Sequence, residues 1–375
     1  MECKFSKHGI ALSYDQVVKP CCEWKKTTDY NQRNHISKVD LATWHINQDM
    51  LETQEQLASG NWPESCINCY RTENQGRGDS IRGNGNHSYQ HYTSDDITLE
   101  IRPGNTCNFA CQTCWPEASS KVAQYYHQAG LIDISKLNSN RMDEFEFLIP
   151  ISNRIKDVIL LGGEPFYDKS CKKFLLWANE NLTANLMLFT NGSMIDYEFL
   201  KSYPGRITLI FSLDAINKPA EYIRYGTIWN EVLLNYKQVR ELSNVDVRVN
   251  ITCSVYNYIY LEPLIQMLCS DWPGIVTFGK PNALHFLEGV IPIKHRSKLI
   301  DSLARAVELV KKTDIELGQQ QNAVNAINSH IINLQNQPWD NESYNKFTNF
   351  VSTLDNVKGI QLAEFCPELA EMLSH

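Results

Sequence analysis

The sequence predicts an α/β fold: an open, partial (β/α)6 TIM-like barrel, preceded by a cysteine-rich module and followed by a helical region. Three observations support this prediction. From residue 97 on, β-rich segments alternate with helical patterns, as they do in consecutive βαβ units of a parallel sheet. Six such units occupy about 190 residues, which is too few for the eight units of a closed barrel. From Lys294 on, the pattern becomes helical. The expected regions are residues 1–92, 93–292 and 293–375.

The first region is expected to end in a loop, because residues 74–96 are rich in Gly, Asn, Ser and Asp and contain few apolar side chains. Six strand-like segments follow: ITLEIRPG (97–104), DVILLGGEP (157–165), NLMLFTNG (185–192), ITLIFSLDA (207–215), DVRVNITCSV (246–255) and GIVTFGKP (274–281). Helices are expected between them, for example at 169–182 and 229–242. In parallel α/β folds the functional residues lie at the carboxyl ends of the strands, so the residues that follow each segment are the candidates.

The third region shows the spacing of amphipathic helices. The segment LIDSLARAVELVKK (299–312) places Leu299, Leu303, Val307 and Val310 on one face. Residues 319–337 are rich in Gln and Asn but keep apolar residues at helical spacing. This pattern predicts a surface helix rather than a prion-like tract.

Composition excludes several classes of protein. The net charge is −8, and 43% of the residues are apolar, which excludes a disordered chain. The acidic balance and the lack of a long basic run argue against nucleic acid as a partner. No apolar stretch approaches the roughly 18–20 residues that span a membrane, and the N-terminus has no signal-peptide pattern. We therefore expect a cytoplasmic protein without a membrane partner.

Twelve cysteines in such a protein point to metal binding or catalysis, because thiols stay reduced in the cytoplasm. Four of them are isolated in the sequence and are interpreted as small buried apolar side chains: Cys171, Cys253, Cys269 and Cys366. The other eight are grouped near the N-terminus and directly after the first expected strand.

The group after the first expected strand is CNFACQTC, with Cys107, Cys111 and Cys114 in C-x3-C-x2-C spacing. Thiolates bind iron–sulfur clusters, and three of them on one loop would leave one iron of a four-iron cube free for another ligand. A zinc site is the alternative, although zinc generally requires a fourth ligand and favours paired C-x2-C motifs. The spacing therefore favours an iron–sulfur cluster.

Four further motifs follow in order, the first three at strand ends. They are GGEP (Gly162, Gly163, Glu164, Pro165), TNG with Thr190 and Asn191, SLD with Ser212 and Asp214, and then Arg224 in EYIRYGTIW. With the cysteine spacing, they resemble the radical SAM superfamily over about residues 96–290. Each motif alone is weak, since TNG is also a turn signal and GGEP also suits a flexible loop. Their order at successive strand ends supports the resemblance.

The resemblance implies a [4Fe-4S] cluster on the three cysteines and S-adenosylmethionine (SAM) bound by the residues of the four motifs. The two glycines would let the backbone approach the amino acid part of SAM, and Arg224 would bind its carboxylate. The family often has an aromatic residue before the third cysteine, whereas this chain has Thr113. Trp115, directly after Cys114, is the candidate contact to the adenine, with packing as the alternative.

In the N-terminal region, Cys3 and Cys21 are followed much later by the C-x2-C pair Cys66 and Cys69, and a helix is expected before that pair. This arrangement resembles an auxiliary-cluster module called SPASM, or its shorter form, twitch. Cys3, Gln16 and Cys21 occupy the places of its Cys-Gly-Cys pattern, with Gln replacing Gly. Gln75 stands where a full SPASM domain has its next cysteine. The resemblance therefore implies one auxiliary [4Fe-4S] cluster on Cys3, Cys21, Cys66 and Cys69.

Two alternatives remain open for this module. Cys22 could replace Cys21, because two adjacent thiols rarely both reach one cluster, and a four-cysteine zinc site could replace the cluster. The position of the module before the barrel, rather than after it, departs from the usual arrangement.

The resemblance implies an enzyme that reductively cleaves SAM to a 5′-deoxyadenosyl radical, which abstracts a hydrogen from its substrate. A flavodoxin or ferredoxin would be the electron donor. The expected reaction is oxidative modification of a peptide or protein side chain. The alternatives are dehydrogenation of a small molecule such as a polyol or sugar, and a non-catalytic iron–sulfur scaffold. No catalytic acid or base is identified, and Glu100 and Cys253, near strand ends, are interpreted as structural.

Overall fold

The computed structural model describes residues 2–25, 27–74, 80, 82–83, 90–137, 140–270, 276–279, 281 and 283–374. The chain divides into two compact units. Unit 1 comprises Met1–Gly104, Asn138–Leu188 and Glu198–Ile207, and unit 2 comprises Asn105–Leu137, Phe189–Tyr197 and Thr208–His375. This division runs through the expected region 93–292, and the three expected regions stay a prediction. Within the described residues, no helix combines the length and apolar character needed to cross a membrane.

The strands have the parallel arrangement that the alternating pattern predicts. They are β1 (Gly9–Ser13), β2 (Ile97–Arg102), β3 (Ile155–Leu160), β4 (Asn185–Thr190), β5 (Ile207–Ser212), β6 (Val245–Thr252) and β7 (Val276–Gly279). Their order in the sheet follows their order in the chain, which places β1 and β7 at the two edges. Four described pairings are parallel: β1 with β2, β2 with β3, β3 with β4, and β6 with β7. The α/β class and the open, partial barrel are therefore confirmed.

One strand lies where no strand of the barrel is expected. β1 belongs to the N-terminal cysteine-rich region and pairs with β2, with Ile10 opposite Leu99 and Leu12 opposite Ile101. The sheet thus has seven strands rather than six. The sequence does not reveal β1 because GIALS is a run of only five residues, and so short an apolar run does not distinguish a strand from a helix.

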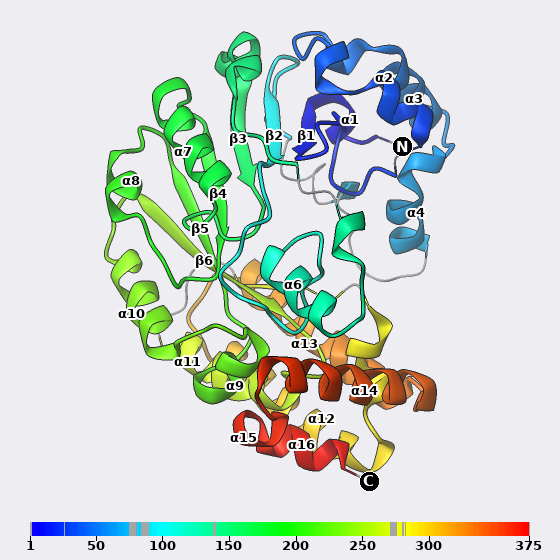
Figure 1. The fold of residues 1–375 in the computed structure, drawn as a ribbon, viewed down its shortest axis with the longest axis vertical. Helices are drawn as coiled ribbons and strands as arrows, with labels where there is room; N and C mark the ends of the chain where they lie inside the picture. The colour runs from blue at the N-terminus through cyan, green and yellow to red at the C-terminus, as the bar shows by residue number, and fades with distance from the viewer. Residues whose placement is uncertain are drawn as a thin grey trace. The chain divides into compact units, whose positions relative to one another are not determined.

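Unit 1 carries short helices beside its strands (Figure 1). In the N-terminal part, α1 contacts both α3 and β1. The helices are α1 (Phe5–His8), α2 (Thr28–Arg33), α3 (Gln48–Ala58), α4 (Ile67–Asn74), α7 (Lys169–Asn181) and α8 (Tyr197–Ser202, whose first residue belongs to unit 2). Short 3-10 turns occur at Ile36–Lys38, Trp44–Ile46, Glu64–Cys66 and Glu146–Arg154.

Side-chain caps explain where several of these helices begin. Asn47 Oδ1 accepts a hydrogen bond from Met50 N (2.9 Å) at the start of α3. Asp168 Oδ1 does the same for Ser170 N (2.7 Å) and Cys171 N (3.2 Å) at the start of α7. The helices expected before Cys66 and at 169–182 are therefore present.

Unit 2 contains the remaining helices: α6 (Ser120–Gln128), α9 (Asn217–Ile223), α10 (Trp229–Arg240), α11 (Leu261–Cys269), α12 (Ile293–Lys311), α13 (Leu317–Asn336), α14 (Asn341–Lys358), α15 (Leu362–Phe365) and α16 (Pro367–Leu373). Its 3-10 turns are Ile134–Lys136, Tyr258–Tyr260, Leu284–Phe286 and Glu288–Val290. The helices expected at 229–242, 299–312 and 319–337 are confirmed. The four apolar residues predicted on one face of α12 are all buried, and α12 packs between α11 and α13.

The isolated cysteines mostly behave as small apolar residues. Cys171, Cys253 and Cys366 are buried, as expected. Cys269 is only half-buried, and its Sγ accepts a hydrogen bond from Thr313 Oγ1 at 3.2 Å.

Candidate functional site

In unit 2, the loop that precedes α6 carries Cys107, Cys111 and Cys114, and the backbone of the segment after α9 holds it in place. Ala110 N donates to Tyr225 O (2.8 Å) and Gln112 N donates to Ile223 O (2.8 Å). These two bonds flank Cys111. The backbone on both sides of Cys111 is therefore fixed to the end of α9 and the residues that follow it.

A glycine allows this close approach. Gly226 follows the anchoring segment and has a φ of +112°. Residues that carry a Cβ rarely adopt this backbone conformation. A Cβ at this position would lie 2.9 Å from Cδ1 of Phe109 and 3.2 Å from the carbonyl oxygen of Asn108. Any larger residue would push the cysteine loop away from the loop after α9.

Arg224 brings a buried positive charge to the cysteine loop. Its Nη1 lies 3.8 Å from Cys111 Sγ, and its Nε lies 2.8 Å from Oδ2 of Asp214, a residue that is 1% exposed. Thr252 N donates to Asp214 Oδ1 (2.7 Å) and fixes that carboxylate. Burial raises the pKa of the Cys111 thiol, while Arg224 acts in the opposite direction. An arginine in this position favours the thiolate that an iron ion requires.

Asn191 reaches the first cysteine through a small polar network. Its Nδ2 donates to Asn108 Oδ1 (2.9 Å) and lies 4.0 Å from Cys107 Sγ. Its Oδ1 accepts hydrogen bonds from Ser193 N (2.9 Å) and Ser193 Oγ (2.7 Å). Phe109 N also donates to Cys107 Sγ at 3.4 Å. Amide donors on the sulfur stabilise the thiolate form.

Unit 2 therefore brings together Asn191, Asp214 and Arg224, predicted from separate motifs, beside the predicted cluster ligands. Thr190 is buried at the end of β4, and Ser212 is half-buried at the end of β5. Trp115 is 42% exposed, beside Cys114 in the sequence. The contact of these three residues with SAM stays a prediction.

The GGEP motif lies in unit 1, directly after β3. Gly162 has φ of +151°, and a Cβ there would lie 2.9 Å from Gly104 O and 3.2 Å from Cys171 Sγ. Glu164 is buried, and its Oε1 accepts a hydrogen bond from Phe166 N at 3.4 Å. The motif is thus a tightly packed turn, and its role in binding SAM stays a prediction.

Unit 1 holds a second cysteine site, in a small cavity. Four cysteines line this cavity together with residues of α1, α3 and the segment before α4. They are Cys3, Cys21, Cys66 and Cys69, the four that the sequence resemblance predicts as ligands. Burial raises the pKa of the Cys66 thiol to about 12 and that of Cys21 well above its usual value, with neighbouring cysteines adding to both shifts. Burial is the main cause of both pKa shifts, and the smaller contribution from the neighbouring cysteines is consistent with thiols that lie near one another.

Hydrogen-bond donors and one cation surround these sulfurs. Backbone N–H groups of Phe5 and Ser6, at the start of α1, donate to Cys3, and the backbone N–H of Arg82 donates to Cys69. The Ser80 hydroxyl also contacts Cys69 and donates its proton to Glu73 Oε1. The guanidinium of Arg82 interacts electrostatically with Cys3, Cys66 and Cys69. Such donors offset the negative charge of bound thiolates, as in known iron–sulfur sites.

Cys22 has a different environment from Cys21. It does not line the cavity, and its thiol hydrogen-bonds the carboxyl of Glu100 on β2. Cys21 instead interacts with Cys3, Cys66 and Cys69. The geometry thus favours Cys21 over Cys22 as the fourth ligand, and gives Glu100 a partner that the sequence did not suggest.

Gln16, which stands in place of the glycine of the Cys-Gly-Cys pattern, lies in a tight turn before Cys21. Gln16 adopts φ of +58°, in the left-handed region that favours glycine. Its N–H donates to Ser13 O (2.7 Å), and its carbonyl accepts from Ile36 N (2.8 Å). The backbone at Gln16 therefore has a conformation that glycine adopts with less strain. Gln75 lies outside the described residues.

No group of three or more His, Cys, Asp or Glu in the described part of the chain has the arrangement of a site for a single metal ion. In a [4Fe-4S] cube each cysteine binds a different iron, so the sulfurs stand further apart than around one zinc ion. The donor chemistry of both cysteine sites fits a cluster. The ligand assignments themselves stay predictions.

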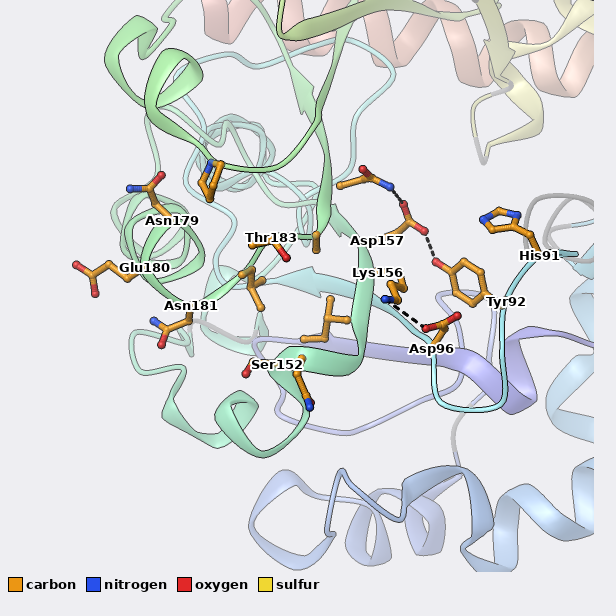
Figure 2. Close-up of a pocket in the computed structure, with 16 residues that line it drawn as sticks. His91, Tyr92, Asp96, Ser152, Lys156, Asp157, Asn179, Glu180, Asn181 and Thr183 are labelled. Atoms are coloured by element: carbon orange, nitrogen blue, oxygen red, sulfur yellow. Dashed lines mark hydrogen bonds and ion pairs between the residues drawn. The ribbon is translucent and has the colours of Figure 1, made fainter.

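A hollow of about 680 Å³ lies elsewhere in unit 1, at the amino ends of β3 and β4 (Figure 2). Three of its charged groups already have partners. Lys156 Nζ lies 3.7 Å from Asp96 Oδ1, and Asp157 accepts hydrogen bonds from Tyr92 Oη and, at 2.9 Å, from Asn185 Nδ2. Because it lies at the end of the strands opposite to the motifs, we do not assign it a function.

Two residues near the sites were missed in the sequence. Lys358 of α14 donates to the cysteine loop of unit 2, and Arg82 faces the cysteines of unit 1. Lys358 lies far in sequence from the cysteine loop, Arg82 lies a short distance after Cys66 and Cys69 but far from Cys3, and neither is part of a motif. Only the proximity created by folding reveals them.

Solved structures that resemble the chain include anSMEcpe with bound AdoMet, which is 16% identical at a TM-score of 0.39 and is matched over 55% of this chain and 59% of that chain. Streptococcus suis SuiB bound to S-adenosylmethionine is 13% identical at a TM-score of 0.42, over 82% of this chain and 70% of that chain. SuiB bound to the precursor peptide SuiA is 14% identical at a TM-score of 0.36, over 70% and 58%. The chain thus spans less than two thirds of the length of anSMEcpe. No family model matches the chain, and no curated protein matches it.

Proposed function

We propose that this chain is a radical SAM enzyme that oxidatively modifies a side chain of a peptide or protein. The observation that carries the proposal is the loop of unit 2 with Cys107, Cys111 and Cys114. Beside this loop, Arg224 lies 3.8 Å from Cys111 Sγ and Asn191 lies 4.0 Å from Cys107 Sγ, and these two residues come from two other predicted motifs. An electrostatically tuned three-cysteine site would have little use in a purely structural loop. A bound [4Fe-4S] cluster and SAM would supply reductive cleavage of the sulfonium to a 5′-deoxyadenosyl radical that abstracts hydrogen.

The chain's own residues have three tasks in this proposal. The three cysteines bind the cluster, and Arg224, oriented by Asp214, presents its remaining N–H donors to an anionic group such as the carboxylate of SAM. The Gly162–Gly163 turn offers backbone groups without a side chain in the way. Asn191 donates toward Cys107 and completes the polar contacts of the loop.

The cysteine site of unit 1 supports a peptide or protein substrate. It occupies the region that resembles the SPASM or twitch module, and relatives with such modules most often act on peptides. In this proposal Cys3, Cys21, Cys66 and Cys69 bind one auxiliary [4Fe-4S] cluster. That cluster would accept an electron from the substrate. A flavodoxin or ferredoxin would supply the reducing electron to the cluster of unit 2.

The first experiment measures 5′-deoxyadenosine formed by the anaerobically reconstituted protein with dithionite and SAM. The control is the variant Cys107→Ala/Cys111→Ala/Cys114→Ala. Product that depends on the three cysteines establishes the radical chemistry. A full complement of iron with neither product nor SAM binding by calorimetry would instead indicate an iron–sulfur scaffold.

The substrate class needs a second experiment. Candidate peptides are co-expressed either with the wild-type protein or with the triple cysteine variant, and the masses of the peptides are compared. A mass loss that matches removal of hydrogen supports the peptide assignment. Unchanged peptides from an enzyme that still cleaves SAM would shift the assignment to a small molecule such as a polyol or sugar.

A further inference from the structure

The last residue of α14 is a buried lysine in unit 2. Lys358 is 8% exposed, and Gly359, with φ of +67°, ends the helix directly after it. The carboxyl end of a helix favours a cation, because its carbonyl groups carry partial negative charge. The side chain nevertheless leaves the helix end and enters the protein, where an ammonium group loses its water.

Lys358 Nζ is held by the cysteine loop. It donates hydrogen bonds to Ala110 O (3.0 Å) and to Gln112 Oε1 (3.1 Å), on the two residues that flank Cys111. The two rings that face it belong to Tyr225, whose centroid is 5.1 Å from Nζ, and Tyr125, at 5.8 Å. The ammonium is therefore enclosed by the loop and by two aromatic faces.

The end of α14 is itself anchored to the neighbouring elements. Tyr225 Oη donates to Lys358 O (3.1 Å), and Tyr222 Oη donates to Asp355 Oδ1 (2.8 Å), one turn earlier in the helix. Asp355 Oδ2 accepts a further hydrogen bond from Leu362 N (2.8 Å). Lys358 is thus presented to the loop from a fixed helix end rather than from a flexible tail.

The charge of Lys358 has no carboxylate in hydrogen-bond contact among the described residues; its two recorded hydrogen-bond acceptors are neutral. Burial lowers the pKa of Lys358 to about 8, although Cys111 and Asp355 act in the opposite direction. A buried cation with neutral partners is costly unless an anion forms nearby. Three cysteine thiolates on iron would form such an anion.

We propose that Lys358 is a positioning residue of the unit 2 site: it anchors the cysteine loop from the C-terminal helix α14, and its charge stabilises the reduced form of the cluster bound there. The inference rests on the proposed function only in requiring a cluster on these cysteines. It assigns a task to the C-terminal helices, which the motifs of the barrel do not reveal.

The charge and the hydrogen bonds have separable effects. An adjacent positive charge stabilises the more negative, reduced cluster and raises its reduction potential. The hydrogen bonds hold the loop and slow the loss of iron. If the lysine were purely structural, its replacement would change the rate of iron loss and leave the reduction potential unaltered.

The experiment compares wild type with Lys358→Met, which keeps the length of the side chain, and Lys358→Gln, which keeps a hydrogen-bond donor without the charge. Lys346→Met is the matched control, because Lys346 lies on the same helix and pairs with Glu342 at the surface. To isolate one cluster, all four proteins carry Cys66→Ser and Cys69→Ser. The midpoint potential is measured by anaerobic titration followed by electron paramagnetic resonance, and iron release is measured with a chelator.

We expect a more negative midpoint potential in both Lys358 variants and about tenfold faster iron release in Lys358→Met, with Lys346→Met unchanged. Potentials equal to that of wild type in folded variants that hold iron would overturn the inference. If Lys358→Met does not fold, the midpoint potential of Lys358→Gln is compared with that of wild type and decides the outcome. A wild-type parent that holds no iron on the unit 2 cysteines would instead refute the proposed function, which separates the two failures.

Discussion

The two cysteine sites of this protein are built in opposite ways. In unit 2, three cysteines come from one loop of eight residues, and the buried charges that face them come from distant parts of the chain. In unit 1, four cysteines come from three separate segments, and their hydrogen-bond donors lie within a few residues of them or, for Arg82, a short distance along the chain.

This difference shows what each site requires of the fold. The unit 2 loop supplies its ligands locally and depends on folding for its electrostatics. The unit 1 site depends on folding for the ligands themselves, because Cys3 and Cys21 must meet Cys66 and Cys69. The ion pairs differ in their carboxylates: Asp214 is 1% exposed and Glu73 is 24% exposed, whereas Arg224 and Arg82 are similar at 14% and 17%.

The largest expected difference between the sites is in SAM cleavage. We expect Cys111→Ser to abolish 5′-deoxyadenosine formation, because this loop holds the iron that would bind SAM. Cys69→Ser should retain measurable cleavage, since it affects only the auxiliary site. Chromatographic measurement of 5′-deoxyadenosine from both variants tests this. Equal loss of product in the two would mean that the sites do not have separate functions.

The second prediction concerns the adjacent thiols in unit 1. Cys21→Ser should lose the auxiliary cluster, about four of about eight irons per chain, because Cys21 faces the other three sulfurs. Cys22→Ser should keep its iron, because Cys22 faces Glu100 instead. Iron, sulfide and zinc analysis after anaerobic reconstitution decides between them. The reverse pattern would make Cys22 the ligand, and zinc in place of sulfide would identify a four-cysteine zinc site.

The third prediction tests the buried ion pair. Asp214→Asn should lower the free energy of unfolding by about 3–5 kcal/mol, because it leaves Arg224 buried without its counter-charge. The control is Asp246→Asn, which breaks an exposed pair with Arg248 at the same 2.8 Å separation and should cost less than about 1 kcal/mol. Denaturant unfolding of the cluster-free proteins measures both. Similar losses in the two variants would contradict the assigned importance of burial.

The fourth prediction concerns the ion pair in unit 1. Burial tends to raise the pKa of Glu73, but hydrogen bonds from Arg82 and Ser80 bring it below its ordinary value of 4.5. A lowered pKa means that the folded state binds the proton less tightly than the unfolded state. The stabilisation is therefore present above about pH 4.5 and is lost as the pH falls through the lowered value.

Glu73→Gln should accordingly cost about 1–2 kcal/mol at pH 7 and less at pH 3. Unfolding of the cluster-free wild type and variant at both pH values gives the comparison. A cost that does not change with pH would show that the carboxylate charge is irrelevant to this contact.

The smallest expected effect is at the turn before Cys21. Gln16→Gly should stabilise unit 1 by about 1 kcal/mol, because glycine adopts φ of +58° without the steric cost of a Cβ. Gln16→Ala retains the Cβ and should bring no gain. Thermal unfolding of the cluster-free proteins distinguishes them. A gain in the alanine variant would assign the effect to the Gln side chain rather than to the backbone.

The sequence by itself determined the α/β class, the open barrel, six of the seven strands and the helices at 169–182, 229–242, 299–312 and 319–337. These features depend on periodicity and on turn residues, which act over a few residues. It also indicated the cysteine loop, because three ligands in eight positions form a local pattern. The short strand β1 was not evident, because five residues carry too little periodicity.

The tertiary structure alone decided which distant residues meet. It placed Lys358 between the residues that flank Cys111, paired Arg224 with Asp214, and directed Cys21 into the cavity and Cys22 toward Glu100. Cys21 and Cys22 are neighbours in the chain, and the folded backbone determines which of the two side chains points into the cavity. Charge–charge interactions in a buried site likewise depend on distance and on water exclusion, and neither is encoded in residue spacing.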